Sequence, residues 1–486
     1  MAIMGWKNKK IIIFAFLVTV LFCTFIAFDI FPFLRGPAPY PPDWQWDYLF
    51  VNTISRVWMP LLFIGVTLFF AFFLEQKSDM FIIKHQNKIL FGCIILFFCI
   101  QISLSYFSRA GLGVLISRIV NPDMNGYFTA ANNIKDISLF LKQFNQKVLS
   151  LPMHAQGHPP GAILFFWGIE YILRPISPLF SFLEHIRISH NDIAVLWKNL
   201  TLSQKVVALF TSFFIPFLST FSCFFVYYIG RYLYTTRVGI RAAVLLLTIP
   251  SLLLFIPIND VFLPLFPLSS FLCFIIGLKE EKKYLLFISG IIFSLGLFFS
   301  LSLAPLLFIF AVYLLWNNNT NIQKILYDGI IFLAAILLLP VMLYLFFGYD
   351  TIVVSQTLMS GLPEGRDYIT WVFFNLSDFF IFLGVPLSLY FCLVLFQLVK
   401  NIRIRTFKNL DPLTGGFIGM LISLDISGSV RGEVARIWIP FYPFIVLILA
   451  LFITKQLKVK NYIFISILCL QFLQILFMQE FWVMLW

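Results

Sequence analysis

Two aspartates lie close together in the segment PYPPDWQWDY of a chain that has few acidic residues. A carboxylate at the edge of an apolar body can act as a general base and take the proton of a hydroxyl group. Asp43 is the stronger candidate because Pro42 restricts the backbone directly before it, and Asp47 is the alternative. Tryptophan prefers the membrane interface, so a rigid interfacial turn would explain the aromatic residues. It would not explain the two acids.

Two histidines lie four positions apart in HAQGHPPG, and each could contact an anion. The spacing of His154 and His158 would suit a metal on a helix, but the glycine and prolines argue against a helix through His158. The Pro-Pro-Gly sequence favours a helix that begins there, and a helix N-terminus attracts anions such as phosphate. We therefore expect His158 to donate to an anion and count it as a candidate catalytic residue. A solvated histidine in a capping turn is the alternative.

The segment RGEVARIW follows the helix break Ser-Gly-Ser and carries two arginines around an acid. Arg431, Glu433 and Arg436 could form a salt-bridged helix start at the membrane interface. The arginines, however, fall on the side of the membrane where basic residues are usually rare. Arginine binds phosphate oxygens through two parallel hydrogen bonds, so a phosphate-bearing ligand would explain this exception. Arg109 in YFSRAG is a further candidate of the same kind.

Four more polar residues are candidates for lining a substrate site on the same side. The segment NPDMNGYF contains Asp123 and Tyr127, although Asn-Pro and Asn-Gly are first of all turn signals. His154 is a candidate for binding rather than catalysis. Asp260, after Asn259, ends an apolar run. It is either a polar cap of that run or part of the wall of the substrate site.

The composition is that of an integral membrane protein. Of the 486 residues, 60% are hydrophobic and only 12% are charged. Long apolar runs without alternation predict an all-α, polytopic transmembrane bundle. The net charge of +12 does not indicate nucleic-acid binding, because most Lys and Arg lie in short loops between apolar runs. The seven cysteines all lie inside apolar runs and have no zinc-site spacing.

The distribution of Lys and Arg predicts a cytoplasmic N-terminus, an uncleaved first span and about 11–13 spans in all. We treat 1–486 as a single membrane domain with outside loops at 32–50, 108–203, 349–370 and 427–437. Residues 161–183 are assigned to a re-entrant or membrane-surface hairpin. Counting them as a crossing would place every later basic loop outside. The candidate residues all fall in the outside loops or at span ends that meet them, so the active face is predicted to be non-cytoplasmic.

These motifs together resemble the C-type membrane glycosyltransferases, the GT-C class, which includes protein O-mannosyltransferases and aminoarabinose transferases. The resemblance rests on the acids of loop one, on His158-Pro-Pro-Gly before a membrane-surface helix, and on GRYLYTTRVGIRAA, which leads to a span ending near Pro250 and Asp260. RGEVARIWIP is similar to late motifs of bacterial members. The adjacent acid pair of the family appears here with three residues between Asp43 and Asp47. That spacing leaves the catalytic acid unassigned between them.

The resemblance implies a hexosyl or pentosyl transferase in the cell membrane. Its donor would be a sugar linked to polyprenyl phosphate, and its acceptor a glycan, lipid or protein. The mechanism would be inverting, with a loop-one aspartate as the base. The resemblance implies no cofactor, and although a divalent metal is possible, nothing in the sequence indicates one.

Two other function classes remain open from the sequence. A transporter or flippase of lipid-linked glycans should carry charges along a path through the bilayer. The few charges within spans here, Asp328, Asp378 and Asp425, lie near span ends. A ligase of pre-assembled glycans is poorly separated from a monosaccharide transferase by sequence alone. A non-catalytic scaffold would not explain why the polar candidates fall on one side.

Overall fold

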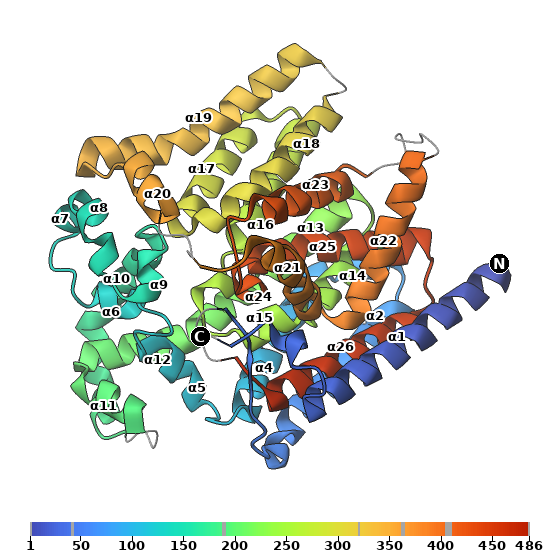
Figure 1. Cartoon of the computed structure of the whole chain (residues 1–486). Helices are drawn as coiled ribbons and strands as arrows, with labels where there is room; N and C mark the ends of the chain where they lie inside the picture. Colours follow the sequence, from blue (N-terminus) through green and yellow to red (C-terminus); the bar gives the residue numbers. More distant parts are fainter. Residues whose placement is uncertain are drawn as a thin grey trace.

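The computed structural model describes residues 2–39, 43–186, 191–318, 321–360, 365–403 and 411–484. Their secondary structure is almost entirely helical, which confirms the predicted all-α class (Figure 1). Pro42, on which part of the argument for Asp43 depends, lies outside the described residues.

The elements of the first half are α1 (Ala2–Phe28), η1 (Pro32–Arg35), β1 (Asp47–Tyr48), η2 (Ile54–Arg56), α2 (Trp58–Gln76), α3 (Asp79–Lys84), α4 (Gln86–Phe107), α5 (Gly113–Val120), α6 (Tyr127–Ala131), α7 (Ile137–Lys142), α8 (Phe144–Lys147), η3 (Val148–Ser150), α9 (Met153–Gln156), α10 (Gly161–Leu173), η4 (Arg174–Glu184), α11 (Asn191–Asn199), α12 (Leu202–Thr220), α13 (Ser222–Leu233) and α14 (Thr236–Leu246).

The elements of the second half are α15 (Pro250–Leu254), η5 (Asn259–Val261), α16 (Leu265–Lys279), α17 (Lys283–Phe299), η6 (Leu301–Leu306), α18 (Leu307–Asn317), α19 (Ile322–Phe347), α20 (Thr351–Ser360), α21 (Tyr368–Leu383), α22 (Val385–Arg403), α23 (Pro412–Ser427), α24 (Val434–Ile437), η8 (Ile439–Phe441), α25 (Tyr442–Leu451), η9 (Phe452–Gln456), α26 (Asn461–Phe481) and β2 (Trp482–Val483).

The protein is a multi-pass membrane protein by the length and apolarity of its helices. In the described part of the chain, nine helices are long and apolar enough to cross a membrane, or up to ten if α21 and α22, which are bent by 118°, form one span. Three shorter apolar helices, α17, α18 and α23, occupy places where we predicted further crossings.

Two apolar segments differ from a simple membrane-crossing helix. The apolar run at 242–258 is long enough for a crossing, but it is broken between α14 and α15, where Pro250 begins a new short helix. The segment 161–183, predicted to be re-entrant, forms α10 and η4, which together are long enough for a span. Both pack against α12. Whether this segment crosses the membrane or turns back stays a prediction.

One end of the helical body gathers basic loops that we predicted to be cytoplasmic. Arg241 forms an ion pair with Glu75 (2.7 Å), and the amide of Asn461 donates to the Glu75 carbonyl (2.9 Å). Tyr234 donates to Asp411 (2.8 Å). We call this the basic end. It joins the loop after α2, the α13–α14 turn, the start of α23 and the segment before α26.

The opposite end joins loop one to the ends of α4 and α26, and we call it the acid-loop end. Arg56 donates to the Arg109 carbonyl (3.2 Å), and Glu480 accepts from the Thr53 amide (3.1 Å). Helices α2, α4 and α26 run between the two ends, so the loops sort into two sets as the charge pattern predicted. Which end faces the cytoplasm stays a prediction.

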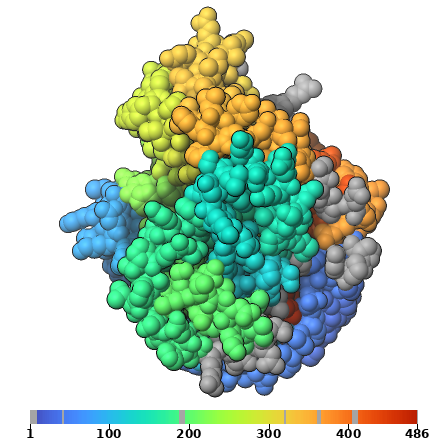
Figure 2. Space-filling model, turned by 90° about the vertical axis from the view of Figure 1, so that its left-hand side faces the viewer, coloured from blue at the N-terminus to red at the C-terminus, as the bar shows by residue number. Residues whose placement is uncertain are grey.

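The segment 108–203 covers one face of the molecule (Figure 2). It consists of short helices, α5 to α11 with η3 and η4, of which α10 and η4 together are long enough to cross a membrane. Helix α20 lies beside it, and Thr357 donates to the side chain of Asn145 (2.7 Å). The centre of the body is apolar, since every residue of α25 is buried.

Candidate functional site

Five of the candidate residues gather around the guanidinium group of a sixth, Arg436. Arg436, almost fully buried, forms an ion pair with Glu433 (2.7 Å) and approaches Asp260 (3.8 Å) and the Nδ1 atom of His154 (3.5 Å). Burial opposes the charged form, but the charges of Glu433 and Asp260 raise the pKa of Arg436 above its ordinary value. The group stays charged. Together with Tyr127 and His158, these residues form what we call the arginine cluster.

The two histidines of the cluster are neutral near pH 7. Burial, followed by the positive charge of Arg436, lowers the pKa of His154 to about 3 and that of His158 to about 4. The His158 ring meets the Tyr127 ring edge-on (5.6 Å between centroids), and its Nδ1 lies 3.4 Å from the Ser300 hydroxyl. A neutral imidazole keeps one N–H donor and one acceptor, so it can still donate to an anion.

The His-Pro-Pro-Gly motif positions His158 through a close helix contact. Pro160 caps α10, which begins at Gly161. A β-carbon on Gly161 would overlap the Phe298 carbonyl at the end of α17. Only glycine allows this approach, and it brings His158 beside Ser300, the residue that follows α17.

The sequence RGEVAR, residues 431–436, which we call the RGEVAR segment, is held in a tight turn by Asn375 of α21. Gly432 (φ 100°) and Glu433 (φ 58°) both have left-handed backbone conformations, which the Arg-Gly-Glu sequence accommodates at Gly432 without strain. The side chain of Asn375 accepts from the Gly432 amide (3.1 Å) and donates to the Val430 carbonyl (2.9 Å). This turn fixes where Arg431 and Arg436 lie.

Asp43 lies on the other side of the same turn, away from the arginine cluster. It accepts a hydrogen bond from the Trp371 indole (3.2 Å). The guanidinium group of Arg366 lies 5.5 Å above the Trp371 ring and donates to the Arg431 carbonyl. Arg431 donates in return to the Arg366 carbonyl (2.7 Å). Asp43 and Arg431 are therefore joined through two intervening side chains.

Asp378 ties loop one to the RGEVAR segment. Its two oxygens accept from the Trp46 indole (2.8 Å) and from the Ala435 amide (2.7 Å). Trp46 is almost fully buried and packs against Phe382 (5.3 Å). One carboxylate thus holds the segment that carries Asp43 against the segment that carries Arg436.

The remaining candidates lie outside these two groups. Asp47 is exposed in β1, which pairs with β2, and its charge acts on Arg109. Burial lowers the pKa of Arg109, against the opposing charges of Glu480 and Asp47. Asp123 has an exposed side chain, but its backbone interacts with His154.

Several contacts in this region were not predicted. Asp378 was noted only as an acid near a span end, and Trp371, Ser300 and Asn375 were not singled out at all. Arg366 carried a usable signal, because it is a basic residue in a loop predicted to be outside, as Arg431 is. The others sit within apolar runs, where sequence gives no sign of the residue they contact.

An apolar groove of about 610 Å³ lies between η4 and α12. It is lined only by hydrophobic residues of α4, α10, η4 and α12. Phe214 in its wall stacks on Phe165 (6.4 Å), and Phe165 packs against Phe262 (5.3 Å), two residues after Asp260. Aromatic contacts therefore connect the groove to the stretch of chain that directly follows Asp260.

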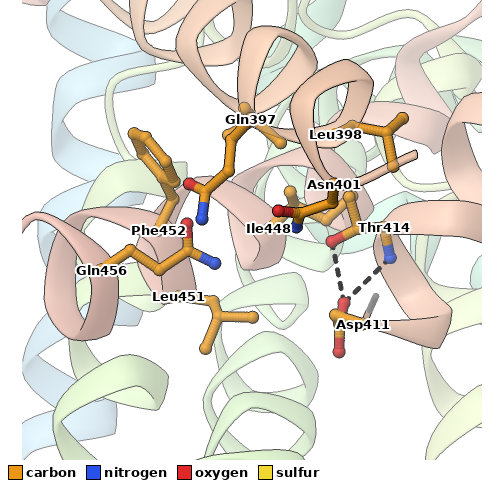
Figure 3. A pocket seen from close by; sticks show the side chains of 10 residues that line it. Gln397, Leu398, Asn401, Asp411, Thr414, Ile448, Leu451, Phe452 and Gln456 are labelled. Atoms are coloured by element: carbon orange, nitrogen blue, oxygen red, sulfur yellow. Dashed lines mark hydrogen bonds between the residues drawn. The ribbon is translucent and has the colours of Figure 1, made fainter. Parts of the chain in front are cut away.

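A second, smaller pocket belongs to the basic end and is lined by five polar and five hydrophobic residues. Amide side chains of Gln397, Asn401 and Gln456 surround it together with Thr414 and Asp411 (Figure 3). Asp411 caps α23 and bonds Tyr234 of the basic end, so this pocket is separate from the candidate residues. Within the described residues, no group of three or more His, Cys, Asp or Glu side chains could hold a metal ion.

One family model matches the chain. It describes the dolichyl-phosphate-mannose-protein mannosyltransferase family and covers residues 199–344, from the start of α12 into α19. Asp260 and Ser300 lie within this stretch, whereas loop one and the RGEVAR segment lie outside it. No curated protein and no solved structure matches the chain. The chain resembles the GT-C class of membrane glycosyltransferases, as its motifs led us to expect, and the match supports a transferase of that type.

Proposed function

We propose that the protein transfers a sugar from a polyprenyl-phosphate donor to an acceptor at the non-cytoplasmic face of the membrane, with inversion at the sugar carbon. The acceptor is a hydroxyl-bearing glycan, lipid or protein. The observation that carries the proposal is the position of the RGEVAR segment. It contacts the surroundings of Asp43 through Arg431 and contains the Arg436 of the arginine cluster.

In this mechanism Asp43 takes the proton of the acceptor hydroxyl, and the acceptor oxygen forms a bond to the anomeric carbon of the sugar. The bond from that carbon to the phosphate oxygen breaks at the same time, and the polyprenyl phosphate leaves with the electron pair. Arg431, Arg436 and the neutral N–H of His158 stabilise the negative charge of the leaving phosphate.

Two features support a lipid-linked donor. The apolar groove between η4 and α12 offers hydrocarbon surface for an isoprenoid chain, and ring contacts lead from it to Phe262, two residues after Asp260. The α12 wall of this groove also belongs to the stretch matched by a family whose name includes a lipid-linked mannose donor, whereas its α4, α10 and η4 walls lie outside that stretch.

The test is to replace each loop-one acid by its amide. Asp43→Asn keeps an oxygen that can accept from Trp371 but removes the proton acceptor, so turnover should fall by about a hundredfold or more. Donor binding should stay near that of the wild type. Asp47→Asn is the matched control and should cost less. Turnover is measured as sugar transfer from radiolabelled polyprenyl-phosphate mannose in membranes that contain the protein.

If Asp47→Asn loses turnover and Asp43→Asn keeps it, Asp47 is the base and the roles of the two acids are exchanged. If both variants keep full turnover, loop one is structural and the mechanism proposed for it is wrong.

A further inference from the structure

Two buried asparagines beside the arginine cluster have no hydrogen-bond partner for their side chains within the described part of the chain. Asn125 is 2% exposed and Asn259 is 3% exposed. Neither the amide oxygen nor the amide nitrogen of either residue is bonded there. Burying an unpaired polar group costs about 1–3 kcal/mol, so such groups in a folded protein require an explanation.

Both asparagines belong to segments that build the cluster. Asn125 stands two residues before Tyr127, and Asn259 directly precedes Asp260. The charge of Asp260 contributes to the raised pKa of Tyr127, whose main cause is burial, so the two segments lie within electrostatic reach. Gly126 packs against Pro152 and Ala155, which holds the Asn125 turn against the helix of His154.

A buried arginine joins the stretches of chain that precede these two segments. Arg118, at the end of α5, donates to the carbonyls of Leu254 (2.9 Å) and Ile256. Asn125 stands seven residues after Arg118, and Asn259 stands three residues after Ile256. The positions of both asparagines are therefore set by the fold and not by bonds of their own side chains.

We infer that the side chains of Asn125 and Asn259 form hydrogen bonds with the hydroxyl groups of the donor sugar and so select which sugar binds. An amide presents one acceptor and two N–H donors and carries no charge, which matches the paired donor and acceptor character of sugar hydroxyls. In the proposed mechanism Arg436 of the cluster serves the phosphate. The two asparagines are thus specificity-determining residues for the sugar, and the inference rests on the function proposed above.

The experiment separates stability from recognition. The purified full-length protein and its Asn125→Ala and Asn259→Ala variants are compared by thermal unfolding and by binding of two kinds of probe. The first probe is sugar-free polyprenyl phosphate. The second is the tightest binder among polyprenyl-phosphate mannose, glucose and arabinose. Asn375→Ala is the matched control, because Asn375 is equally buried but both of its amide groups are bonded.

We expect each alanine variant at Asn125 or Asn259 to bind the sugar-bearing probe about tenfold more weakly, the loss of one hydrogen bond of ordinary strength. Affinity for polyprenyl phosphate should not change. The melting temperature should stay level or rise, because an unpaired buried group has been removed. Asn375→Ala should lower it.

The inference is overturned if both asparagine variants melt lower and keep the wild-type preference for the sugar-bearing probe, which would indicate structural amides. It is also overturned if the wild type binds sugar-free lipid as tightly as every sugar-bearing lipid. A wild-type protein that binds none of the probes would contradict the proposed function itself, and the inference would fall with it.

Discussion

Arg431 and Arg436 stand five positions apart but lie in different electrostatic surroundings. Arg436 is buried between two carboxylates that already balance its charge. Arg431 is partly exposed, and among the described residues no carboxylate lies within ion-pair distance of it. An incoming phosphate meets more uncompensated charge at Arg431, whereas Arg436 also maintains the fold around Glu433 and Asp260.

Substitution of the two arginines should therefore separate binding from stability. Arg431→Lys should weaken binding of polyprenyl-phosphate mannose about tenfold, since an ammonium group loses the paired hydrogen bonds of a guanidinium. Its melting temperature should stay near that of the wild type. Arg436→Ala should lower the melting temperature clearly, because the buried carboxylate of Asp260 and the partly buried one of Glu433 lose their partner. Unchanged donor affinity in the alanine variants of both arginines would remove the phosphate assignment.

The neutral histidines make stability depend on pH. The pKa values of His154 and His158 are lowered to about 3 and about 4 in the folded protein, against an ordinary value of 6.5. Below pH 6.5 the unfolded chain binds more protons than the folded protein, so stability should fall as pH decreases from 6.5 towards 4. Thermal unfolding at intervals between pH 7.5 and pH 4.5 measures this slope. His158→Gln should flatten the slope, and a variant with the full slope of the wild type would contradict the prediction.

Among the helices, α10 carries the clearest link between a sequence motif and a position in space. Proline and glycine in HAQGHPPG correctly predicted a helix start after His158. The sequence could not tell what the glycine is for. Gly161 is required by the carbonyl of Phe298, which lies far away in the chain and has no signal of its own.

An alanine at this helix contact should cost both stability and activity. Gly161→Ala adds a β-carbon where the Phe298 carbonyl lies, so α10 must move away from α17 and His158 from Ser300. We expect a loss of about 1–3 kcal/mol in the free energy of unfolding, as for other overpacked sites. Gly168→Ala in the same helix is the control. No atom lies within 4 Å of its added β-carbon, so stability should stay level or rise. Equal effects of the two substitutions would mean that the contact is not decisive.

At the scale of the whole molecule, hydropathy and charge predicted the fold class and the grouping of loops at two ends. They failed where a run of suitable length is broken, as at Pro250, because hydropathy does not report helix continuity. The candidate residues were identified one motif at a time. Their division into the arginine cluster and the surroundings of Asp43 depends on tertiary contacts such as that of Asp378, which no local pattern encodes.

The orientation of the body in the membrane is open to direct measurement. Topology reporters fused after Asn125 and after Asn191 should both report the non-cytoplasmic side, because the positive-inside rule places the basic end in the cytoplasm. Asn125 belongs to the acid-loop end, and Asn191 begins α11 beyond η4. A cytoplasmic signal at Asn191 alone would mean that α10 and η4 cross the membrane.

The two-residue sheet between β1 and β2 sets an order of events during biosynthesis. Asp47 pairs with Val483 and Tyr48 with Trp482, so the loop that carries the proposed base is anchored by residues at the far end of the described chain. Loop one leaves the ribosome early, yet its anchor is among the last described residues to be translated. A nascent chain therefore lacks this anchor of Asp47 until synthesis reaches α26 and β2, whereas the partners of Asp43 and Trp46 in α21 are made earlier. Proteolytic loss of this short strand would release Asp47 without touching it, while Asp43 would keep its bond to Trp371.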